Sequence, residues 1–162
     1  MELYLFIYKA VLFLILLIAS IYDIKKRIIP NKLILIGAIS GISMNIVLIF
    51  ILDDISTKIV LTNILLGTFA GAAPLLLAEI FSRLVSKRQS IGGGDIKLYA
   101  VSGIFLGFQL TTESYFILSL MSLTVIGCMI LFGKIKRGEY IPFGPFISAA
   151  VFVSVLFKNS FY

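Results

Sequence analysis

The 162-residue sequence lacks histidine and tryptophan altogether, contains one cysteine, and carries charge on only 14% of its side chains. Without histidine, the chain has neither the commonest general base nor the commonest metal ligand. The single cysteine, Cys128, cannot form a disulfide framework or a paired-cysteine zinc site, and we expect it to be a small apolar packing residue. Any chemistry therefore has to use carboxylates, lysines, hydroxyls or backbone groups.

The shortage of charge excludes two broad classes of protein. Hydrophobic residues make up 60% of the chain and the mean hydropathy is +1.11, which is more apolar surface than a soluble domain of this length can bury. Disordered chains are excluded because they are polar and poor in aromatic residues. The sequence is that of a membrane protein, in contact with a lipid bilayer.

Six apolar runs approach the length of about 20 helical residues that crosses a hydrocarbon core. The fourth is the weakest, and the sixth is interrupted by glycine and proline at its start. The first lacks the basic flank and cleavage site of a signal peptide. We predict one all-α domain over residues 1–162, a bundle of about six transmembrane helices. The runs are 3–22, 33–52, 59–81, 96–110, 114–132 and 141–157.

Basic residues predict the orientation of this bundle, because lysine and arginine concentrate in cytoplasmic loops. Eleven of the 14 lie in or beside the loops that follow the first, third and fifth runs. We therefore expect both termini outside and these loops in the cytoplasm, in a multi-pass protein of the cell membrane. The same rule explains the net charge of +6, so we expect no nucleic-acid partner. The eleven are Lys25, Lys26, Arg27, Lys32, Arg83, Lys87, Arg88, Lys97, Lys134, Lys136 and Arg137.

Six of the eight acidic residues have ordinary explanations. Four lie at the outer ends of runs, where a solvated or headgroup-level charge is expected. Glu139 lies in a basic loop, and Glu79 lies four residues before Arg83 on one helical face, which favours a structural ion pair. In the third run, Gly67 and Gly71 have the spacing typical of close helix packing. The four outer acids are Glu2, Asp53, Asp54 and Glu113.

Asp23 and Asp95 remain, and both lie at run ends on the predicted cytoplasmic side. An acid this close to hydrocarbon is costly and points to a functional site. Each also has a simpler explanation: Asp23 could pair with the basic residues after it, and Asp95 could be a helix N-cap after a flexible hinge. The preceding glycines favour a site, because they give the backbone freedom and let another backbone approach closely. These glycines are Gly92, Gly93 and Gly94.

Two carboxyl groups at one membrane depth can share a proton if the fold brings them together. One then acts as a general base on water while the other polarises a carbonyl, which is the chemistry of aspartic proteases. Such a pair titrates as a unit. The alternative from another class is a small transporter or channel in which Asp23 and Asp95 form a proton or cation site. A pure assembly scaffold is a third interpretation.

Three passages of the sequence resemble the type IV prepilin peptidase family, the membrane aspartic proteases of the GxGD class. YDIKKRIIPN at 22–31 is similar to the segment of the first aspartate. GGGDIKL at 92–98 is similar to the motif of the second, and IPFGPF at 141–146 to the segment that opens the last helix. The resemblance covers essentially the whole chain. Other GxGD proteases, such as signal-peptide peptidases, place their first aspartate deeper in a helix than Asp23 lies.

The resemblance implies that Asp23 and Asp95 are the catalytic pair, that water is the nucleophile, and that no metal or cofactor takes part. It implies a prepilin or pseudopilin substrate with a basic leader and a hydrophobic helix, cut at the cytoplasmic face. Many bacterial members carry an insertion with paired cysteines and also methylate the new amino terminus. This chain lacks that insertion, so we expect peptidase activity alone, and the oligomeric state stays open. Residues expected to shape the site or contact substrate are Gly92, Gly93, Gly94, Lys97, Pro142 and Gly144.

Overall fold

The computed structural model describes residues 2–51, 56–86, 91–133 and 142–157, and every regular element within them is a helix. This confirms the predicted all-α class. Four of the five helices are long and apolar enough to cross a membrane, and the fifth is a shorter apolar helix. Several residues named above lie outside the described residues: Asp53, Asp54, Lys87, Arg88, Lys134, Lys136, Arg137 and Glu139. The helices are α1 (Glu2–Lys26), α2 (Asn31–Ile51), α3 (Thr57–Ser86), α4 (Gly93–Leu131) and α5 (Gly144–Phe157).

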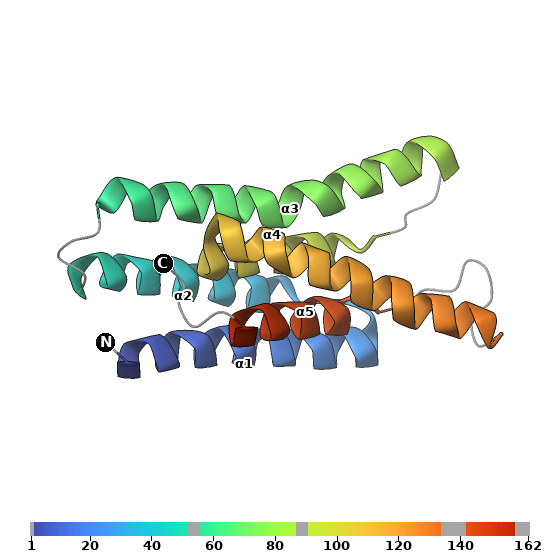
Figure 1. The fold of residues 1–162 in the computed structure, drawn as a ribbon, viewed down its shortest axis with the longest axis horizontal. Coiled ribbons are helices and arrows are strands. Elements are labelled where there is room, and N and C mark those ends of the chain that lie inside the picture. Colours follow the sequence, from blue (N-terminus) through green and yellow to red (C-terminus); the bar gives the residue numbers. More distant parts are fainter. Residues whose placement is uncertain (1, 52–55, 87–90, 134–141, 158–162) are drawn as a thin grey trace.

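Helix α4 is not straight, because it reverses direction at Gly107 (Figure 1), where φ is 67° and ψ is −176°. The hydroxyls of Tyr99 and Ser114 lie 2.7 Å apart across the turn, whereas 15 residues of straight helix span about 22 Å. We call residues 93–106 the first arm and residues 108–131 the second arm. They correspond to the fourth and fifth apolar runs. The sequence predicted the break between residues 110 and 114, which is wrong in position because the chain turns at Gly107. Glycine takes the positive φ of this turn without strain.

Helix α3 packs on the first arm with backbone against backbone. A Cβ atom on Gly103 would lie 2.0 Å from the carbonyl oxygen of Gly67, and one on Gly71 would lie 2.3 Å from that of Tyr99. No side chain fits at these positions, which confirms the packing role predicted for Gly67 and Gly71. The contact fixes the position of the first arm along α3, and Asp95 lies at the start of that arm.

Helix α5 lies along α1, and their contact combines apolar and polar groups (Figure 1). Leu12, Leu16, Ile147 and Val151 are fully or almost fully buried in the shared core. The hydroxyls of Ser20 and Ser148 are 2.6 Å apart. As a result, the first residue of α5 lies beside the last turn of α1. Away from this core, the helices expose many large apolar side chains, as expected of surfaces that face lipid.

Candidate active site

The end of α1 and the starts of α4 and α5 lie at one end of the bundle (Figure 1), and the two aspartates selected from the sequence line one cavity there. Asp23 lies in the last turn of α1 and Asp95 in the first turn of α4. Their exposed fractions are only 1% and 2%. Both line a cavity of about 460 Å³, within the range of about 300–1,000 Å³ typical of ligand sites. The other lining residues are Arg27, Ile28, Ile29, Asn31, Ile91, Gly92, Gly93, Gly94 and Lys97.

The carboxylate of Asp23 is held by the start of α5. The backbone N–H of Gly144 donates a hydrogen bond of 2.8 Å to Oδ2 of Asp23. The first N–H groups of a helix have no partner inside that helix, so Gly144 has its donor free for this contact. Pro142 precedes the helix and Pro145 lies in its first turn, where a missing N–H is tolerated. The predicted helix break at this passage is therefore confirmed.

Gly144 also permits this contact because it has no Cβ atom. A Cβ atom at this position would lie 2.9 Å from Oδ2 and 3.1 Å from Cβ of Asp23. A distance below 3.0 Å between such atoms forces one of them to move. The approach of α5 to Asp23 therefore depends on glycine here, which explains the site-shaping role predicted for Gly144.

Asp95 is buried without the contact that the N-cap interpretation requires. The N-cap residue of α4 is Gly92, which makes no side-chain cap bond, and the N–H of Asp95 donates to the carbonyl of Gly92 at 3.0 Å. The N-cap interpretation of Asp95 is therefore wrong. Oδ1 of Asp95 has no hydrogen-bond partner within the described part of the chain. A buried carboxyl oxygen left in this state is suited to binding a ligand or water.

The three glycines before Asp95 act differently from the expectation. Gly92 has φ −67° and ψ 133°, a conformation open to any residue, and Gly93 and Gly94 begin the helix. Backbone freedom is therefore not what they supply. A Cβ on Gly94 would lie 3.1 Å from Cβ of Ile29, whereas a Cβ on Gly93 would meet nothing within 4 Å. Gly94 permits close packing on Ile29, and at Gly93 no side chain covers the wall of the cavity.

Lys97 reaches across the cavity to a residue that the site prediction missed. Its ammonium donates a hydrogen bond of 3.0 Å to Oδ1 of Asn31, at the start of α2. Lys97 forms no ion pair with Asp95 among the described residues. Asn31 belongs to the Ile-Pro-Asn passage quoted for the resemblance, and that passage was the available signal for it.

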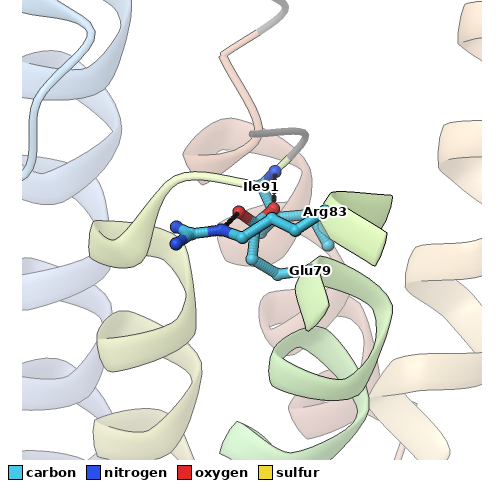
Figure 2. A network of polar contacts seen from close by, with 3 residues as sticks. All are labelled: Glu79, Arg83 and Ile91. Atoms are coloured by element: carbon cyan, nitrogen blue, oxygen red, sulfur yellow. Dashed lines mark hydrogen bonds and ion pairs between the residues drawn. The ribbon is translucent and has the colours of Figure 1, made fainter. Parts of the chain in front are cut away.

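A third buried carboxylate, that of Glu79, contacts Arg83 and the cavity-lining residue Ile91 (Figure 2). Glu79, near the end of α3, is 4% exposed and accepts hydrogen bonds from Nε of Arg83 at 2.6 Å and from the backbone N–H of Ile91 at 2.7 Å. The structural pair with Arg83 is confirmed. The bond to Ile91 was missed, because a backbone donor has no signature in the sequence. Elsewhere in the described ranges, no three acidic or cysteine residues gather as a metal site would require.

Two buried carboxyl groups that line one cavity, with glycines in part of its wall, can activate a water molecule to attack a peptide bond. A family model described as the type IV leader peptidase family matches residues 10–131, a range that contains both aspartates. The chain belongs to the type IV leader peptidase family. Gly144 lies beyond the matched range, so its contact with Asp23 is known from the structure alone.

Curated relatives within the leader peptidase family are of moderate similarity. The chain is 26% identical over 158 residues to the prepilin leader peptidase/N-methyltransferase of Bacillus subtilis. The aligned region covers 95% of the chain and 57% of the relative. Its identity to the protein of the same name in Stutzerimonas stutzeri is 27% over 144 residues, covering 89% and 47%. For Dickeya chrysanthemi, the identity is 32% over 103 residues, covering 64% and 36%. The chain spans about half the length of the curated relatives it matches. No solved structure matches it.

Proposed function

We propose that the protein is an aspartic endopeptidase that removes the leader of prepilin-like substrates, with Asp23 and Asp95 as its catalytic pair. The observation that carries the proposal is the pair itself: two carboxyl groups from separate passages of the sequence are both buried and line one cavity. Membership of the leader peptidase family favours this function over a transporter or channel with the same acids as an ion site.

The proposed reaction needs one proton shared between the two carboxyls, which act as a unit. The ionised carboxylate takes a proton from water as its oxygen attacks the scissile carbonyl carbon. The protonated carboxyl gives its proton to the carbonyl oxygen, which forms a tetrahedral intermediate. Collapse of that intermediate breaks the C–N bond. The leaving nitrogen takes a proton from one carboxyl of the pair, and a hydroxyl of the intermediate returns a proton to the other as the new carboxyl group forms. The unpartnered Oδ1 of Asp95 has no hydrogen bond within the described part of the chain that it would have to give up in this scheme.

The proposed substrate is an extended segment that enters beside the glycines, at the cytoplasmic face of the cell membrane. An extended backbone exposes its amide bonds, whereas a helix shields them, and Gly93 leaves space for such a segment. The described basic residues support this orientation, because they concentrate at the end of the bundle that holds the cavity. Six of the eight described basic residues lie there, namely Lys25, Lys26, Arg27, Lys32, Arg83 and Lys97, whereas Lys9 and Lys58 lie toward the other end.

The experiment compares Asp23→Asn and Asp95→Asn with the unaltered protein in proteoliposomes that contain a prepilin-like peptide. Asn keeps the shape of each side chain but removes the ionisable group. We expect each variant to abolish cleavage while still inserting, because neither carboxyl can complete the proton transfers alone. Glu113→Gln, an exposed acid in the second arm, is the matched control and should cleave normally. Cleavage by either aspartate variant near the normal rate contradicts the proposed pair.

A further inference from the structure

Glu79 is a buried acid that the proposed reaction does not use. It does not line the cavity, yet its side chain is only 5% exposed, whereas that of its partner Arg83 is 61% exposed. Because water solvates the exposed Arg83, the ion pair offsets only part of the cost of burying the carboxylate. A buried carboxylate is costly unless it is hydrogen-bonded. The pair with Arg83 alone is therefore a weak reason to bury an acid at this position.

The second contact of Glu79 leads directly to the site. Oε2 accepts the backbone N–H of Ile91 at 2.7 Å (Figure 2), a charge-assisted bond between residues 12 positions apart. Ile91 itself lines the cavity, and only Gly92, Gly93 and Gly94 separate it from Asp95. Glu79 thus joins the end of α3 to the segment from which the second aspartate follows.

The glycine segment has no side chains that could anchor it to its surroundings. A Cβ on Gly93 would meet nothing within 4 Å, and the atoms nearest to a Cβ on Gly94 belong to Ile29. Backbone bonds from Asp95 and Ile96 to the carbonyl of Gly92 tie the segment to α4. The bond from Ile91 N–H to Glu79 ties it to α3.

We propose that Glu79 is a positioning residue for the catalytic pair: as a hydrogen-bond acceptor for Ile91 N–H, it sets the place of the glycine segment and hence of Asp95. The inference rests on the proposed function. It predicts that the hydrogen-bond acceptor matters more than the negative charge. Gln keeps an oxygen that can accept the same hydrogen bond, whereas Leu has a similar size and no acceptor.

The test measures kcat and KM for a prepilin-like peptide with Glu79→Leu, Glu79→Gln and Arg83→Gln in proteoliposomes. For Glu79→Leu we expect kcat to fall by about 100-fold with little change in KM, since misplacement of a reacting group by about 1 Å costs this much. Glu79→Gln should recover kcat to within a few-fold of normal. Arg83→Gln removes the ion pair, leaves the bond to Ile91, and should cleave normally. Equal loss in Glu79→Gln and Glu79→Leu overturns the proposal, as does normal kcat in Glu79→Leu.

A backbone variant covers the case in which Glu79→Leu does not fold. Replacing Ile91 by its α-hydroxy acid converts the N–H donor to an ester oxygen and leaves every side chain in place. The same loss of kcat is expected, and combining this change with Glu79→Leu should add little, because both remove one bond. Undiminished cleavage by the ester variant contradicts the proposal. Failure of the proposed function is a separate result, because the unaltered protein and Arg83→Gln would then not cleave the peptide at all.

Discussion

Replacing Gly144 by alanine is the most direct test of how α5 holds the first aspartate. The new Cβ would lie 2.9 Å from Oδ2 of Asp23, and ordinary contact begins at 3.4 Å, so the two groups have to separate by about 0.5 Å. This separation strains the hydrogen bond of 2.8 Å from Gly144 N–H to the carboxylate. A bond to a charged group contributes about 1.5–3 kcal/mol, and each 1.36 kcal/mol in a barrier is about tenfold in rate. We expect kcat to fall by about 10- to 150-fold.

The assay for Gly144→Ala is the proteoliposome cleavage of a prepilin-like peptide, with thermal unfolding in detergent measured in parallel. Gly127→Ala is the matched control, because a Cβ at Gly127 meets nothing within 4 Å and the residue lies in the second arm, away from the cavity. It should cleave and unfold as the unaltered protein does. A normal kcat in Gly144→Ala, with Asp23→Asn inactive, would falsify the idea that α5 positions this carboxylate.

Three further predictions concern packing, orientation and product. Gly103→Ala should lower the unfolding temperature by several degrees and reduce cleavage, because its Cβ would lie 2.0 Å from the backbone of Gly67; an unchanged melting curve contradicts the backbone contact of α3 with the first arm. With Cys128 replaced by serine, cysteine probes at Lys26 and at position 88 should label from the cytoplasmic side, and labelling from outside reverses the proposed orientation. Mass spectrometry of the product cut by these 162 residues should show an unmethylated amino terminus, and a methyl group would refute the expectation of peptidase activity alone.

The helices and both aspartates could be predicted from the sequence because each leaves a local signal. Apolar runs of sufficient length give the helices, and an acid at the end of such a run is conspicuous. The contact of Asp23 with Gly144 could not be predicted, because the two residues are 121 positions apart and the donor is a backbone N–H. The bond from Ile91 to Glu79 could not be predicted either, because its donor is also a backbone N–H.

Glycine was the residue type whose role the sequence predicted least well. Three consecutive glycines suggested unusual backbone angles at 92–94, yet the described glycines with a positive φ are the isolated Gly107 and Gly133. Composition gives no means to tell a glycine that turns the chain from one that makes space, because both uses depend on neighbours in the fold. Gly67 and Gly71 were predicted correctly, since their spacing places both on one helical face.

The reversal at Gly107 bears on how the protein enters its membrane. The first arm has 14 residues and is about 21 Å long, whereas the hydrocarbon core is about 30 Å thick. A helix this short, with Lys97 near its start, is a poor substrate for independent insertion. Backbone that turns within the hydrocarbon also has to be shielded by protein, and the buried Thr111 donates its hydroxyl to the carbonyl of Gly107 at 2.6 Å. We therefore expect the first arm to enter together with the second and to pack against α3 afterwards, so that the aspartate pair would assemble late in biogenesis.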